Sequence, residues 1–177
     1  LQGVMGEHYA KLFGENDVVA HAILEHYLPT SATGAVADSK IGAVLAIADK
    51  LDSIVTFFAA DLIPSGAKDP YGLRRAATGV VRTLEAHDWH LNLLDILANF
   101  SKQNKEVADT DLAQIINFLN DRVRKLAADS GVRSDIVTAG TANVVTGDLV
   151  YVTDRTNILA KHAKDTNFRD VMESLSR

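Results

Sequence analysis

The stretch SKIGAVLAIADKLDSIVTFF, residues 39–58, repeats apolar residues at steps of three and four along its whole length. The series comprises Ile41, Val44, Leu45, Ala48, Leu51 and Val55. Such spacing returns side chains to one face of a helix, so it predicts a long helix with a buried apolar stripe. Ser39 stands just before the series and is predicted to be its N-cap.

Similar spacing in other segments predicts an all-α protein. Helices are predicted over residues 16–29, 70–88, 91–100, 109–131 and 166–177. Residues 132–163 are less regular, and their β-branched residues leave a hairpin around TGD as an alternative to two short helices. Helices are favoured there, because Asp135 and Asp148 are each suited to capping one.

Helix ends are marked by residues that satisfy free backbone groups. Asn16 or Asp17 is predicted to cap the first of these helices, and Pro29 is predicted to close it. Asp111 with Gln114 resembles a capping box, and Gly131 is a predicted C-cap. Gly79 inside the predicted helix 70–88 indicates a close helix crossing.

Composition limits the class of protein. The chain has 177 residues, 47% of them hydrophobic, and a net charge of −5, so any contact with nucleic acid must be a local patch. It has no cysteine, no apolar run long enough to cross a membrane and no signal-peptide pattern, which fits a cytoplasmic protein. Because it starts at Leu1 inside an amphipathic pattern, we expect a piece of a longer polypeptide.

The polar stretch SKQNKEVADT, residues 101–110, is the best candidate boundary within the chain. It predicts an N-terminal bundle over residues 1–100 and a smaller helical portion over residues 101–177. We find no internal repeat and no low-complexity segment in either part.

The segment SGAKDPYGLRRAA, residues 65–77, combines features of an anion-binding surface. Asp69 is predicted to cap a helix whose first turn contains Pro70. Free N–H groups at that helix start, together with Lys68, Arg74 and Arg75, would favour phosphate.

The two arginines of this segment are predicted to have different roles. Adjacent helical residues point about 100° apart. One of Arg74 and Arg75 could pair inward with Asp49, Asp52 or Asp61 while the other faces an anion. An intramolecular salt bridge that ties two helices together explains the same residues equally well.

No catalytic constellation is visible in the sequence. It lacks a Gly-rich loop with GKS or GKT, and it lacks GxSxG and HExxH. His87, Asp88 and His90 lie at a predicted helix end, where histidine is favourable beside free carbonyls. Asp49 and Asp52 fit the polar edge of a core helix. We therefore predict no catalytic residue and no metal site in this chain.

Four stretches, taken in order, carry a resemblance to a known family. They are LQGVMGEHYA, AILEHYLPT, ADKLD and LIPSGAKDPYGLRRAATGVVR. In this order and at these separations they resemble the beta subunit of bacterial glycyl-tRNA synthetase. The likeness continues more weakly through FLNDRVRKLAADSGVRSDIV and FRDVMESLSR, so it covers essentially the entire chain.

The resemblance implies an alpha–beta enzyme, in which the alpha subunit holds glycine and ATP with Mg²⁺ and the beta subunit recognises tRNA. This chain would be an internal fragment of the beta subunit, with no cofactor of its own. Residues 1–100 would resemble its HD-like helical bundle, truncated on the N-terminal side, and residues 101–177 the helical extension that follows. Its partners would be the alpha subunit, tRNA and the remainder of the beta subunit.

The resemblance also implies a degenerate HD site. Asp49 matches the later metal-binding aspartate of HD phosphohydrolases, but no histidine–aspartate doublet precedes it, and His87–Asp88 comes after it. We therefore expect no phosphohydrolase activity, although a metal-dependent HD-type phosphohydrolase remains the alternative function.

The preferred function is tRNA binding, with Lys68, Arg74 and Arg75 contacting phosphates. Tyr71 is predicted to be a half-buried packing residue rather than a base-stacking one. A purely structural helical module is the third hypothesis, and it predicts that all three cations are buried in ion pairs.

Overall fold

A computed structural model describes residues 2–66, 68–104, 107, 110–142, 147–163, 165 and 168. Within these residues it contains eight α-helices and no strand, which confirms the all-α class. The helices are α1 (Val4–Leu12), α2 (Asp17–Glu25), α3 (Lys40–Ala59), α4 (Leu73–His87), α5 (Leu93–Gln103), α6 (Leu112–Asp129), α7 (Ser134–Gly140) and α8 (Leu149–His162). The HD-like likeness stays a prediction, and the helix predicted over 166–177 lies outside the described residues except for Phe168.

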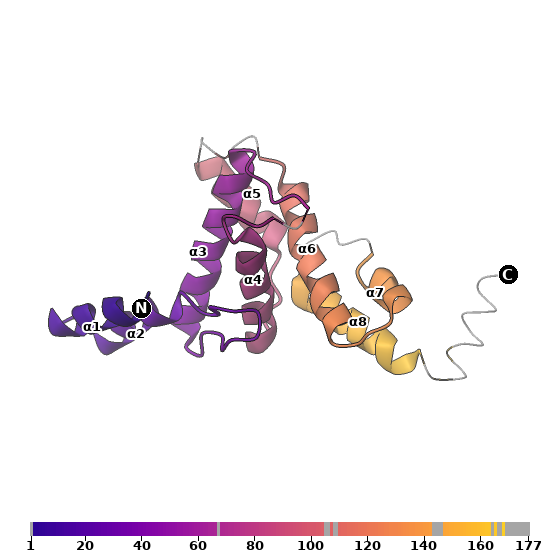
Figure 1. The fold of residues 1–177 in the computed structure, drawn as a ribbon, viewed down its shortest axis with the longest axis horizontal. Helices are drawn as coiled ribbons and strands as arrows, with labels where there is room; N and C mark the ends of the chain where they lie inside the picture. The colour runs from indigo at the N-terminus through magenta and orange to yellow at the C-terminus, as the bar shows by residue number, and fades with distance from the viewer. Residues whose placement is uncertain are drawn as a thin grey trace.

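The helices form an elongated arrangement (Figure 1). The α1–α2 pair lies at one end against α3, and the α7–α8 pair lies at the other end. Between them, α4 packs on α3, α6 and α8, and α5 packs on α6. No helix in the described part of the chain combines the length and the apolar character that a membrane crossing requires.

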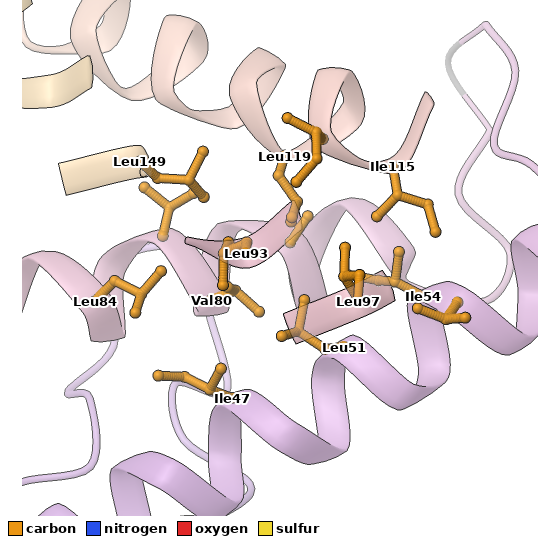
Figure 2. Packing of buried hydrophobic residues seen from close by; sticks show 14 of the residues in the cluster. Ile47, Leu51, Ile54, Val80, Leu84, Leu93, Leu97, Ile115, Leu119 and Leu149 are labelled. Atoms are coloured by element: carbon orange, nitrogen blue, oxygen red, sulfur yellow. The ribbon is translucent and has the colours of Figure 1, made fainter. Parts of the chain in front are cut away.

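One buried cluster joins the central helices (Figure 2). Its labelled members are Ile47, Leu51, Ile54, Val80, Leu84, Leu93, Leu97, Ile115, Leu119 and Leu149, which come from α3, α4, α5, α6 and α8. Val107, inside the predicted boundary 101–110, is buried in the same cluster. The cluster thus draws on both predicted portions, and their division near residue 100 stays a prediction.

Helix α3 buries a different face from the one its spacing predicted. Leu51 and Val55 are buried as expected, but Ile41, Val44 and Leu45 are exposed. The buried residues of α3 are Gly42, Ala43, Ala46, Ile47, Lys50, Leu51, Ile54, Val55 and Phe58. The first half of α3 is apolar on both faces, and the face with glycine and alanine is the one that allows α2 to approach closely.

The predicted helix caps are largely confirmed. The side chains of Asn16, Ser39, Asp111 and Asp148 each accept a backbone N–H in the first turn of α2, α3, α6 and α8. Gly131, with φ +84°, follows the end of α6 as predicted.

The predicted N-cap of α7 and the predicted end of α2 are wrong. Asp135 lies inside the first turn of α7, and Arg133 occupies the N-cap position without a side-chain cap. Helix α2 ends at Glu25, before Pro29.

The favoured pair of short helices, rather than a hairpin, is confirmed over residues 132–163. Helices α7 and α8 pack on each other, and residues 143–146 between them lie outside the described chain.

A buried carboxylate joins α2 to the start of α3. Glu25 is only 3% exposed, and its Oε1 accepts the N–H of Asp38 at 2.7 Å and the N–H of Ser39 at 3.0 Å. Its Oε2 accepts the Ser39 hydroxyl. Burial alone raises the pKa of Glu25, but the three hydrogen bonds together hold that pKa below its ordinary value of 4.5.

The start of α4 differs from the prediction in a way that matters for the arginines. The helix begins at Leu73, not at Pro70, and its N-cap position is Gly72 with φ +70°. Glycine adopts this left-handed conformation without strain, and the turn brings Leu73 into the core. Asp69 is therefore not the N-cap, but its carboxylate still accepts the N–H of Arg74 at 3.2–3.3 Å.

The side chain of Arg74 turns back over the loop before α4. Its Nη1 donates to the carbonyl of Lys68 at 2.9 Å, and its Nη2 donates to the carbonyl of Pro64 at 3.2 Å. Arg74 thus connects the loop to the first turn of α4 through backbone acceptors rather than through a carboxylate.

The predicted close helix crossing at Gly79 is confirmed. A Cβ atom at this position would lie 2.9 Å from Cε of Lys50 on α3 and 3.3 Å from Cδ of Pro29. A side chain here would have to displace the Lys50 side chain, and glycine leaves room for it.

Replacing Glu25 by glutamine is expected to lower the free energy of unfolding at neutral pH by about 1–3 kcal/mol, because the N–H groups of Asp38 and Ser39 lose a charged acceptor that is itself buried. The folded-state pKa of Glu25 is depressed, so its stabilisation is complete above pH 4.5 and is lost as the pH falls through the folded value. Urea denaturation from neutral to acidic pH should therefore give a smaller acid-induced loss for Glu25→Gln. Parallel curves for the two proteins would contradict this role.

Replacing Arg74 by alanine is expected to lower the free energy of unfolding by about 1–2 kcal/mol, because two hydrogen bonds from a charged group to the loop are lost. Arg75→Ala is the matched control, since this exposed neighbour should change stability by less than about 0.5 kcal/mol. Chemical denaturation of both variants measures the difference. Equal destabilisation, or none in Arg74→Ala, would show that Arg74 does not hold the loop.

Candidate nucleic-acid interface

Lys68 and Arg75 lie on the surface at the start of α4. Both are exposed, and neither side chain forms an ion pair or a hydrogen bond with the described residues. Arg74, by contrast, is partly buried and bonded to carbonyls. The two arginines thus have different surroundings, with Arg74 bonded to the loop and Arg75 exposed, and their predicted roles toward an anion stay a prediction.

The alternative of salt bridges at this helix start is wrong for the described residues. Neither arginine pairs with Asp49, Asp52 or Asp61. The inward arginine finds uncharged backbone acceptors instead, because the loop before α4 folds back over it.

The backbone N–H groups at the start of α4 do not form an open anion-binding site. The carboxylate of Asp69 already occupies the position in front of the helix and accepts the N–H of Arg74. A carboxylate there also meets the positive end of the helix dipole. Any external anion would therefore contact side chains, above all those of Arg75 and Lys68, rather than free N–H groups.

A pocket of about 350 Å³ opens beside Arg75, between α3, the chain that follows α2 and the start of α4. Asp49 and Lys50 line it from α3, Tyr71 lines it from the loop before α4, and Arg75 lines it from α4. Asp49 and Arg75 share the pocket without forming an ion pair within 4.0 Å. The outward arginine therefore lies at a concave surface rather than on a flat one.

Lys50 is a buried cation in the wall of this pocket. Its Nζ donates to the carbonyl of His26 at 2.9 Å. Burial lowers the pKa of Lys50, and the nearby Asp49 carboxylate offsets part of that effect. The pocket thus contains two cationic side chains, Lys50 and Arg75, and one carboxylate.

Arg122 is a cation near this surface that the sequence analysis missed. It lies on α6, which packs against α4, and its pKa is lowered by burial and by the nearby charge of Arg74, while Asp121 and Asp69 act in the opposite direction. Its Nε is buried without a hydrogen-bond partner among the described residues. Nothing in the amphipathic spacing of α6 indicated that Arg122 would lie beside the start of α4.

His87 and Asp88 do not form a group of metal ligands with Asp49 in the described part of the chain. Nε2 of His87 donates to the carbonyl of Ala37 at 2.8 Å, and its ring stacks on Trp89 with centroids 4.6 Å apart. Asp88 follows the end of α4 in a left-handed conformation and points to solvent. The histidine is thus engaged in packing, and the aspartate is exposed.

One group of three potential metal ligands converges within the described part of the chain. It consists of Asp88, His90 and Asp154, all exposed, with ligand atoms within 4.8 Å of one another. Asp148 lies 3.0 Å from Nδ1 of His90 and is the main cause that raises the pKa of that histidine. Asp49 is not a member of this group, so the geometry gives the phosphohydrolase alternative no support.

Comparison with known proteins identifies the family. The family described as glycyl-tRNA synthetase beta subunit matches residues 1–142. The glycine–tRNA ligase beta subunit of Leuconostoc mesenteroides is 63% identical over 177 residues, and that of Leuconostoc citreum is 64% identical over 178 residues. The beta subunit of Levilactobacillus brevis is 48% identical over 186 residues.

Each of these three alignments covers the whole of this chain. The chain itself spans 26% of the length of each relative. The match of the family over residues 1–142, together with the resemblance carried by the ADKLD and KDPYGLRR stretches, settles the classification. The chain belongs to the glycyl-tRNA synthetase beta subunit family.

Proposed function

We propose that this chain is a tRNA-contacting part of a glycine–tRNA ligase beta subunit. In this proposal a separate alpha subunit uses ATP and Mg²⁺ to join glycine to tRNA, and the beta subunit holds the tRNA in the cytoplasm. The names of the relatives support the ligase assignment.

The observation that carries the proposal is that Arg75 is exposed and has no bonding partner among the described residues. Arg75 lies at the edge of a pocket, and its side chain has no hydrogen-bond or ion-pair partner among the described residues, whereas the neighbouring Arg74 is bonded to the loop. A guanidinium offers several donors in a plane and binds phosphate oxygens well. Lys68, exposed in the same loop, supplies a second cation, and Arg74 acts by positioning both.

The contact is proposed to be local and directed at the RNA backbone. With a net charge of −5, the chain cannot attract RNA over its whole surface. Phosphate contacts position a nucleic acid without reading its bases. Other parts of the beta subunit, which make up most of the relatives' length, would contribute further contacts.

Arg75→Ala in the complete alpha–beta ligase is expected to weaken binding of glycine tRNA about tenfold, because one charge-assisted hydrogen bond is lost. The slope of log affinity against log salt concentration should become less steep, by the amount that corresponds to the loss of about one phosphate contact. Fluorescence anisotropy of labelled tRNA at several salt concentrations measures both quantities.

The control is Arg133→Ala, which removes another exposed arginine, one that pairs with Asp135 at the start of α7. It should leave the affinity and the salt slope close to those of the unmodified ligase. If Arg75→Ala behaves like this control, Arg75 does not contact tRNA and the proposal fails.

A further inference from the structure

The pocket beside Arg75 has an aromatic wall that phosphate binding alone does not explain. Tyr27, Phe57 and Tyr71 all line it. Its volume of about 350 Å³ falls at the lower end of the range for small-ligand pockets, roughly 300–1,000 Å³. The size and the rings together indicate a ligand with a flat, partly apolar group.

Tyr71 is held in place and yet remains accessible. Its ring packs on Phe57 with centroids 4.6 Å apart and an interplanar angle of 38°. This packing confirms the half-buried residue that the sequence predicted, and the 53% of Tyr71 that is exposed stays accessible to a ligand. A ring supported in this way loses little conformational freedom when a second planar group stacks on it.

Polar groups surround the rings in a pattern that suits a nucleotide. Lys50 and Arg75 provide cations for a phosphate, and the ammonium of Lys50 has three donors but is bonded to a single carbonyl, that of His26. Asp49 and Ser53 provide oxygen acceptors for N–H groups of a base or for ribose hydroxyls.

We infer that this pocket binds one unpaired nucleotide of the tRNA, with its base stacked on Tyr71 and its phosphate at Arg75. The inference rests on the proposed tRNA-binding function and adds the class of RNA element that is bound. Bases inside a duplex are already stacked, whereas unpaired bases can be splayed out onto aromatic side chains. The pocket thus selects a single-stranded element, while Lys68 contacts the adjoining backbone.

The test compares Tyr71→Leu with Tyr71→Phe in the complete alpha–beta ligase, with glycine tRNA as the probe. Tyr71→Leu should weaken binding roughly 5- to 150-fold, the range that corresponds to the loss of one base–aromatic stack. The salt slope should not change, because no charge is removed. Tyr71→Phe keeps the ring and should bind within about twofold of the unmodified ligase.

Tyr151→Leu is the matched control, because Tyr151 on α8 is 55% exposed and outside the pocket. It should leave tRNA binding unchanged. Thermal denaturation identifies any variant that fails to fold. If Tyr71→Leu fails to fold, Ser53→Phe, which fills the pocket without removing a charge or a ring, replaces it and should weaken tRNA binding at an unchanged salt slope.

Failure of the inference and failure of the proposed function give different results. If Tyr71→Leu and Ser53→Phe both bind tRNA normally while Arg75→Ala lowers the affinity and the salt slope, the surface binds only RNA backbone and the nucleotide pocket is wrong. If all three variants bind tRNA normally, the proposed function and the inference are both overturned.

Discussion

The burial of Leu73 sets the register of α4, and the candidate site depends on that register. Leu73 enters the core directly after the left-handed turn at Gly72, and Ala77 and Val80 continue the same buried face. The next two residues, Arg74 and Arg75, then differ by one helical step of about 100°. Packing of one leucine therefore decides which arginine faces the loop and which faces solvent.

This arrangement separates structural charge from charge that is free to bind a ligand. The Asp69 carboxylate and the Arg74 guanidinium satisfy the helix start and the loop before it. Lys68 and Arg75 have no such partners in the described chain and stay exposed. The proposed function assigns these two cations, and the aromatic pocket that Arg75 lines, to an RNA strand.

Local features of the sequence predicted where helices form better than they predicted which face of each helix is buried. Caps such as Ser39 and Asp148 depend on neighbouring residues, so they were predictable. The exposed Val44 shows the limit, because the first half of α3 is apolar all round and only tertiary packing selects its buried face. Arg122 and the pocket arise where helices distant in sequence meet, and no periodicity signals such contacts.

The central claim is that the outward guanidinium of Arg75 contacts tRNA. An arginine-specific dicarbonyl reagent, applied to the complete ligase with and without saturating tRNA, measures this contact through the modification rate of each arginine by mass spectrometry. The account predicts that tRNA slows modification of Arg75 strongly and leaves the exposed Arg133 unchanged. Equal modification rates for Arg75 with and without tRNA would contradict the account.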